Sequence, residues 1–175
     1  SSSSPDRQFA QDAWAHGLRV SSVAASDDHR SQPGQAHWGI TAVSAPDLTR
    51  DSVFEAMFDR HTYGTTGARI LLEFTVDGHP MGRQITIEGT PELRIEAHGT
   101  REIERVEVLR YSPTTEAFRV IRTIRPDGMD FQWSDVDTTL RDDSAIYYVR
   151  LKQRGQVRSR ISMAWSSPIW VQVHD

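Results

Sequence analysis

The stretch Ile70-Leu71-Leu72-Glu73-Phe74-Thr75-Val76-Asp77-Gly78 marks the point where the chain changes its folding pattern. Every second residue from Ile70 to Val76 is large and apolar, and this alternation is typical of a strand that buries one face. Asp77-Gly78 then supplies the residues that a tight turn favours. The pattern therefore predicts that β structure begins near Ala68.

Alternating apolar runs continue to the end of the chain, and no run after Ala68 has helical spacing. The further predicted strands cover residues 84–88, 93–97, 103–111, 118–124, 131–133, 145–152, 157–165 and 169–173. Many short strands with turn residues between them are typical of an antiparallel β-sandwich. We therefore predict a sandwich domain of immunoglobulin or fibronectin type over residues 68–175.

Residues 1–67 have a different pattern, in which helix and strand signals alternate. Ser4-Pro5 predicts the start of a helix that ends near Gly17, and Leu18 to Ala25 then reads as a buried strand. Residues 38–43 predict a second strand, and Thr49 predicts the cap of a second helix that ends near Arg60. A helix followed by a buried strand is one repeat of an α/β barrel. The fold class is therefore an α+β fragment, mainly β, with an incomplete α/β barrel segment at residues 1–67.

The polar residues Ser26-Asp27-Asp28-His29 follow the predicted first strand directly. Residues i and i+2 of an extended segment point to the same side, so Asp27 and His29 can share one ligand while Asp28 points away. Carboxylate oxygen and imidazole nitrogen suit Zn, Mn or Fe. The same residues also fit an ordinary solvated loop, which is the alternative to a metal site.

Composition excludes several classes of function. The net charge is −4, with 20 basic and 24 acidic residues interspersed along 175 positions, so no concentrated basic face for nucleic acid is expected. No apolar run reaches the roughly 18 residues of a membrane span. The chain has no cysteine, so a metal would be held by histidine and carboxylate side chains. Composition leaves the cellular compartment and the oligomeric state open.

Three tryptophans and one arginine each fit either a binding role or a structural role. Trp133, Trp165 and Trp170 could stack on a carbohydrate, but at strand spacing we predict that they pack in or around the core. Arg60 fits either a contact with an anionic substrate or a complement to the dipole of the helix that it ends.

Four short motifs in order resemble the C-terminal part of a bacterial family of unknown function within the polymerase-and-histidinol-phosphatase (PHP) type of metal-dependent hydrolases. They are Ser26-Asp27-Asp28-His29, Pro33-Gly34, the run from Arg60 to Gly67, and the run from Ala164 to Trp170. The resemblance implies that Asp27 and His29 are the last metal-ligand motif of a barrel. The His-x-His motif that opens such a barrel does not occur in these 175 residues.

The resemblance implies that the chain is the C-terminal fragment of a phosphoesterase-like hydrolase, joined to its own N-terminal barrel. A divalent metal (Zn, Mn or Fe) and a small-molecule substrate are expected for the intact protein. The fragment alone is expected to be inactive, and it need not hold a metal. The alternative is a non-catalytic module that binds a glycan or a protein. Binding of a divalent ion through Asp27 and His29 would distinguish the two.

Overall fold

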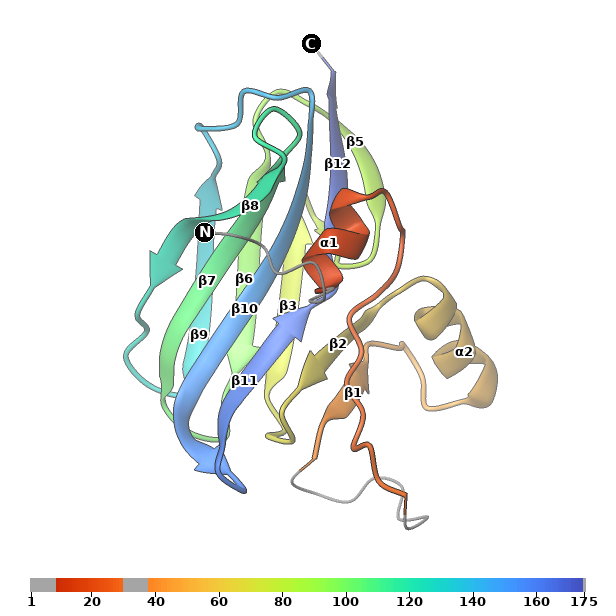
Figure 1. Ribbon diagram of the computed structural model, residues 1–175, viewed down its shortest axis with the longest axis vertical. Coiled ribbons are helices and arrows are strands. Elements are labelled where there is room, and N and C mark those ends of the chain that lie inside the picture. Colours follow the sequence, from red (N-terminus) through yellow and green to blue (C-terminus); the bar gives the residue numbers. More distant parts are fainter. Residues whose placement is uncertain (1–8, 30–37, 175) are drawn as a thin grey trace.

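The computed structural model describes residues 9–29 and 38–174, and these residues form mainly β structure (Figure 1). The elements in chain order are α1 (Ala10–Ala15), β1 (Ile40–Val43), α2 (Arg50–Phe58), β2 (Thr62–Thr65), β3 (Leu71–Val76), β4 (His79–Pro80), β5 (Gln84–Glu88), β6 (Glu92–His98), β7 (Ile103–Ser112), β8 (Ala117–Ile124), β9 (Asp130–Val136), β10 (Ser144–Val157), β11 (Arg160–Ser166) and β12 (Ile169–His174). The prediction that β structure replaces helix after Ala68 is confirmed in the described part of the chain.

Two sheets pack against each other. The smaller sheet has the order β4-β3-β6-β9, and the larger has the path β1-β2-β11-β10-β12-β5, with β7 and β8 on the other side of β10. Neighbouring strands are antiparallel except for β5 and β12, which are parallel. The long strand β10 pairs with β12 along its first part and with β11 along its second, so the two strands follow one another beside it. The switch between them falls at Ser167-Pro168.

The core between the sheets follows from the alternation in the sequence. Leu72, Phe74 and Val76 of β3 are at most 2% exposed, whereas Leu71 on the opposite face of the strand is 60% exposed. They share one apolar cluster with inward residues of the larger sheet, including Tyr147. Complete burial of such side chains stabilises the fold by about 1.5–3 kcal/mol each. The prediction for the tryptophans is confirmed: Trp133 packs on this cluster, and Trp165 and Trp170 belong to the smaller cluster described next.

A smaller aromatic cluster holds α1 against the outer face of the larger sheet. Trp14 is buried, and its ring centroid lies 5.2 Å from that of Tyr148 and 6.1 Å from that of Phe118. The Trp14 indole N–H donates to Val20 O at 3.0 Å. This bond fixes the direction in which the chain leaves α1. The predicted start of this helix at Ser4-Pro5 lies outside the described residues.

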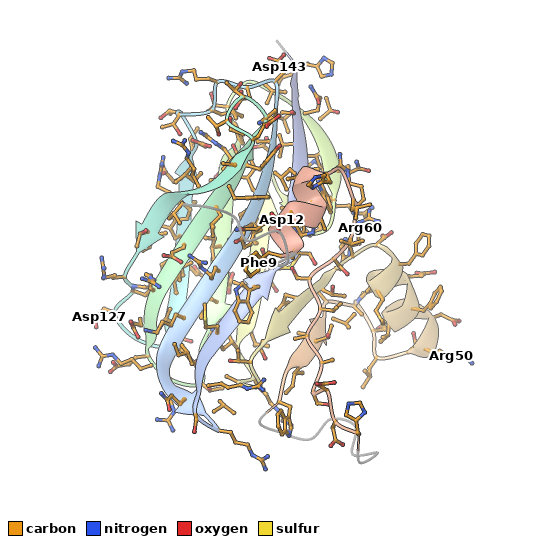
Figure 2. The ribbon with its side chains drawn as sticks, viewed as in Figure 1. Phe9, Asp12, Arg50, Arg60, Asp127 and Asp143 are labelled. Carbon is orange, nitrogen blue, oxygen red and sulfur yellow. The ribbon has the colours of Figure 1, made fainter. Side chains whose placement is uncertain are left out.

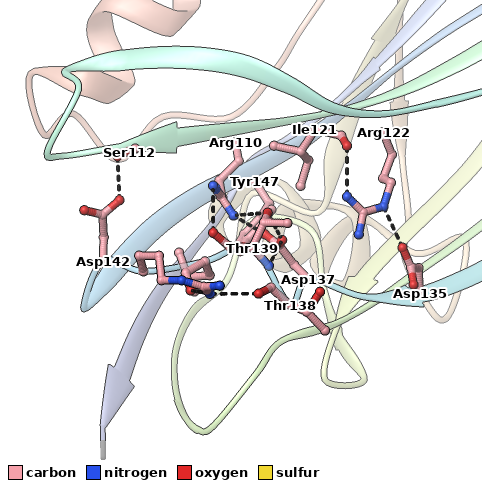
Figure 3. Close-up of polar contacts among 12 residues, drawn as sticks. Arg110, Ser112, Ile121, Arg122, Asp135, Asp137, Thr138, Thr139, Asp142 and Tyr147 are labelled. Atoms are coloured by element: carbon pink, nitrogen blue, oxygen red, sulfur yellow. Dashed lines mark hydrogen bonds and ion pairs between the residues drawn. The ribbon is translucent and has the colours of Figure 1, made fainter.

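A buried ionic network joins the end of β9 to β7 and β10 (Figure 3). The Asp137 carboxylate is fully buried, and it accepts hydrogen bonds from Arg110 Nη1 at 2.5 Å and from Tyr147 Oη at 2.8 Å. Thr139 donates two more, from Oγ1 at 2.6 Å and from its N–H at 3.1 Å. Burial tends to raise the pKa of Asp137, but the bonds from Thr139, Tyr147 and Arg110 outweigh it and hold that pKa below its usual range. Burial, together with the Asp137 charge, raises the pKa of Tyr147.

The first 67 residues contribute to the larger sheet. β2 pairs with β11 and β1 pairs with β2, so both strands extend the sheet that the later residues build. Barrel closure is not seen in the described ranges. The proposed domain boundary at residue 67 stays a prediction. Thr49 caps α2 as predicted, since its hydroxyl accepts the Ser52 N–H at 3.2 Å.

Candidate functional site

The arm (residues 18–29) leaves α1 and runs beside β2 and β1 (Figure 1). The predicted strand from Leu18 to Ala25 is wrong, since these residues form no strand. Their backbone is bonded to hydroxyl side chains of the sheet instead of to a neighbouring backbone ladder. The Ser22 N–H donates to Ser167 Oγ at 2.8 Å, and Thr62 Oγ1 donates to Ser22 O at 2.9 Å.

A second hydroxyl bonds the arm further along. Thr41 Oγ1 on β1 accepts the Ala24 N–H at 2.9 Å and donates to Ala24 O at 2.7 Å. One side chain thus takes both bonds that a neighbouring strand would make with Ala24. We call Ser22, Ala24, Thr41, Thr62, Ser166 and Ser167 the hydroxyl junction. It lies where β11 gives way to β12, and Ser22 Oγ also donates to Ser166 O there at 2.8 Å.

Two glycines allow the arm to approach this closely. A Cβ added at Gly39 would lie 2.5 Å from Ala25 O, and one at Gly64 would lie 3.1 Å from Ala24 Cβ. A contact of 2.5 Å requires the backbone to move. The stretch from Tyr63 to Gly67 contains most of β2, which was not predicted as a strand, and Gly64 within it carries one side of this contact.

Asp27 and His29 lie at the far end of the arm. Asp27 Oδ1 and His29 Nε2 are 3.4 Å apart, and the two side chains are 95% and 90% exposed. The side chains therefore converge as predicted, but the reason differs. Asp27 has φ 54°, in the left-handed region that aspartate tolerates better than most residues, so the pair meets across a bend and not along an extended strand.

The pair fits a divalent ion in donor type and spacing, but it is incomplete. With metal–ligand distances of about 2.1 Å, two donors 3.4 Å apart can bind one ion. A catalytic zinc usually has about three protein ligands. Among residues 9–29 and 38–174, no group of three or more His, Cys, Asp and Glu side chains could hold a metal. The assignment of Asp27 and His29 as ligands stays a prediction, and further ligands would come from outside these ranges.

A further group of residues, which no sequence pattern predicted, lies around Trp170 on β12. Arg19 at the start of the arm and Arg60 after α2 both lie over the Trp170 ring, with guanidinium carbons 5.0 Å and 6.0 Å from its centroid. Arg83 and His61 complete the group through electrostatic contact. The four segments are far apart in the chain, so spacing gives no signal. Of the three arginines, only Arg60 was considered from the sequence, where it fitted either a contact with an anionic substrate or a complement to the helix dipole.

The chain is therefore a two-sheet β protein whose arm carries an exposed aspartate–histidine pair. Residues 9–85 match a family described as a protein of unknown function (DUF3604). The matched segment contains α1, α2, the arm and the strands β1 to β4.

Three relatives in Chlamydia share a larger part of the chain. An uncharacterized protein of Chlamydia pneumoniae is 34% identical over 153 residues, which is 78% of this chain and 23% of the relative. Uncharacterized proteins of Chlamydia trachomatis and Chlamydia muridarum are 32% and 33% identical over 93% of this chain and 28% of their own length. The chain thus spans about a quarter of the curated relatives that it matches. No solved structure matches the chain.

The two helices in the described ranges have six and nine residues, and neither is long and apolar enough to cross a membrane.

Proposed function

We propose that this chain is the C-terminal part of a metal-dependent hydrolase that acts on a phosphoester. In this proposal residues 1–67 are the end of an α/β barrel, and residues 68–175 are a sandwich of immunoglobulin or fibronectin type. The observation that carries the proposal is the pair Asp27 and His29. Asp27 Oδ1 and His29 Nε2 lie 3.4 Å apart, and both side chains are exposed to solvent. A divalent ion bound there would lower the pKa of a water molecule and neutralise charge on the phosphoryl oxygens.

The chain's own residues would position the ligands. The hydroxyl junction bonds Ser22 and Ala24 to the sheet, so the arm leaves a rigid scaffold only a few residues before Asp27. Asp27 offers carboxylate oxygen and His29 offers ring nitrogen. Ser26 Oγ accepts the Asp28 N–H at 3.3 Å, which stabilises the bend between them.

Exposed apolar side chains in the first 67 residues support the proposal that another part of the full-length protein packs against them. Phe54, Met57 and Phe58, three apolar residues of α2, are more than half exposed. On the arm, Val23 is also exposed. Relatives that match this chain have about three quarters of their length beyond the match. A barrel formed by such residues would cover the apolar face and supply the remaining ligands.

The test uses the full-length protein, with metal content and hydrolysis of bis-p-nitrophenyl phosphate in Mn or Zn as the two measurements. Asp27→Ala and His29→Ala are each expected to remove bound metal and to lower kcat at least about 100-fold, since loss of a ligand disrupts the site. His98→Ala is the matched control, because His98 is an exposed histidine that pairs with Asp130 on β9. Unchanged metal content in both variants would refute the assignment.

The second candidate is a non-catalytic interaction module, which the exposed apolar face of α2 favours. In that case binding of the partner protein would be indifferent to EDTA and to His29→Ala, and Phe54→Ser would weaken it.

A further inference from the structure

Arg19 and Arg60 lie over the Trp170 ring, and Arg83 is bonded to Trp170 through its backbone. We call these three arginines, which come from separate segments, the arginine cluster. Arg19 and Arg60 lie over the Trp170 ring at 5.0 Å and 6.0 Å. Arg83 directly precedes β5, and its backbone carbonyl accepts the backbone N–H of Trp170 at 3.0 Å. Figure 2 shows Arg60 beside the chain that leaves α1. The fold thus brings these three arginines together near the start of the arm. Arg19 lies eight residues before Asp27 in the sequence.

Arg60 is held firmly in this place. Its Nε donates to Gly82 O at 2.9 Å, and its backbone has φ 64°. Gly82 has φ 92°, and a Cβ there would lie 2.4 Å from Arg60 O. The turn after α2 therefore packs directly on the Gly82 backbone. This contact directs the Arg60 guanidinium toward Trp170 and leaves its terminal nitrogens available to a ligand.

The cluster has more positive charge than the described residues neutralise. Arg83 pairs with Asp59 at 3.0 Å. Within residues 9–29 and 38–174, no carboxylate lies in ion-pair distance of Arg19 or Arg60. Burial, and after it the nearby charge of Arg60, lowers the pKa of Arg19.

Buried hydrogen-bonding atoms without a partner lie at the same place. In the described part of the chain, two buried side-chain atoms lack a hydrogen-bond partner: Trp170 Nε1 and His61 Nε2. Trp170 is only 4% exposed. Burial, with the charges of Arg83 and Arg60, lowers the pKa of His61, so its ring is neutral at pH 7. An unpaired buried donor is unfavourable, and here it adjoins two guanidinium groups that have no carboxylate partner in the described ranges. Arg19, Arg60 and the Trp170 indole N–H therefore offer donors to which an anionic acceptor could bind.

A cavity of about 580 Å³ adjoins the cluster. Its lining includes Arg19 and Trp170 of the cluster, the aromatic residues Trp14 and Tyr111, and the polar residues Gln84 and Gln172, whereas Arg60 lies outside the lining. Its size is in the usual range for small-molecule sites. Aromatic walls with a cationic end suit a ligand that has an anionic group and an organic body.

We propose that Arg19 and Arg60, which both lie over the Trp170 ring, bind the phosphate group of a small phosphorylated molecule whose organic part occupies the cavity. Two guanidinium groups without a counterion match a phosphate monoester, which carries a charge of about −1.5 to −2 at pH 7. This site is separate from Asp27 and His29, and the inference does not depend on the proposed hydrolase.

The test follows the indole N–H signals of the ¹⁵N-labelled chain, which has 5 Trp and thus five such signals. The Trp170 signal is assigned by its loss in Trp170→Phe. Inorganic phosphate and phenyl phosphate are titrated at constant ionic strength and pH 7.5, with acetate as the monoanion control. We expect a saturable shift of the Trp170 signal, with phenyl phosphate binding more tightly than inorganic phosphate.

Arg19→Gln and Arg60→Gln should each weaken phosphate binding at least about tenfold, since each removes a charge-assisted contact. Arg122→Gln is the matched control, because Arg122 pairs with Asp135 away from the cluster. Asp27→Ala should bind phosphate normally, which separates this site from the metal pair. A linear shift, an equal shift with acetate, or unchanged binding in both cluster variants would overturn the proposal. Equal affinity for the two phosphates would refute the role of the cavity. Peak dispersion in each variant reports whether it is folded.

Discussion

Replacing Asp137 with asparagine removes a negative charge from the buried network of Figure 3 while keeping the size of the side chain. The Asp137 side chain is fully buried, and that of its partner Arg110 is 14% exposed. After the change the Arg110 cation remains in the protein interior without the carboxylate that accepts its hydrogen bond. We therefore expect a large loss of stability.

The size of the loss follows from the burial of the pair. Breaking a buried ion pair by removing one partner costs about 3–5 kcal/mol. Asparagine keeps one oxygen that can still accept a bond from Tyr147 or Thr139, so we expect about 3 kcal/mol, at the lower end of that range. For a chain of this length that corresponds to a fall in Tm of about 6–12 °C.

Urea unfolding followed by circular dichroism at pH 7 measures the loss. Asp135→Asn is the matched control, since Asp135 lies two residues away and pairs with Arg122 at 2.6 Å where both side chains are partly exposed. We expect about 1 kcal/mol or less for the control, as for other exposed pairs. Equal losses in Asp137→Asn and Asp135→Asn would refute the argument that burial decides the strength of these pairs.

The same variant has a distinct pH dependence. Because the folded-state pKa of Asp137 is lowered, its ionisation contributes stability above the ordinary pKa of about 4, and this is lost as pH falls through the folded value. The stability difference between the parent chain and Asp137→Asn should therefore shrink on acidification from pH 5 to pH 2.5. A difference that stays constant over this range would contradict the lowered pKa.

Two further predictions concern the first 67 residues. Gly39→Ala should cost about 1–3 kcal/mol and speed hydrogen exchange of the Ala24 amide, because the new Cβ would meet Ala25 O at 2.5 Å; slow exchange in the variant would show that the arm does not need this contact. Phe58→Ala should change the stability of this chain by less than about 0.5 kcal/mol, because Phe58 is 75% exposed, whereas Phe74→Ala should cost about 3–5 kcal/mol. Similar losses in thermal melts of the two phenylalanine variants would mean that α2 is already covered.

The sequence alone predicted the β elements well, because their signal is local. Alternation between buried and exposed residues places β3 within one residue of its observed start and most later strands within three residues of their observed bounds. The long strand β10 continues to Val157, beyond its predicted end at residue 152, and the short strands β2 and β4 were not predicted. The cap of α2 is also local, since Thr49 bonds to a residue three positions away. Both features depend on neighbours along the chain.

Tertiary structure decided how the arm is bound. Leu18 to Ala25 has the small and apolar residues of a buried strand, but its backbone partners are hydroxyls from β1, β2 and the β11–β12 switch. A serine or threonine that bonds to a distant backbone has no periodic signal. The β strands before and after residue 67 also share one sheet, which composition could not indicate.

The two candidate sites show the same division. Asp27 and His29 were found from sequence because they are two residues apart, and a bend at Asp27 brings them together. Arg19, Arg60 and Trp170 come from three distant segments, and they meet because the β11–β12 switch and the close packing on Gly82 bring these segments together. Local spacing therefore revealed the metal-ligand pair, while the arginine cluster depends on long-range packing that sequence spacing does not encode.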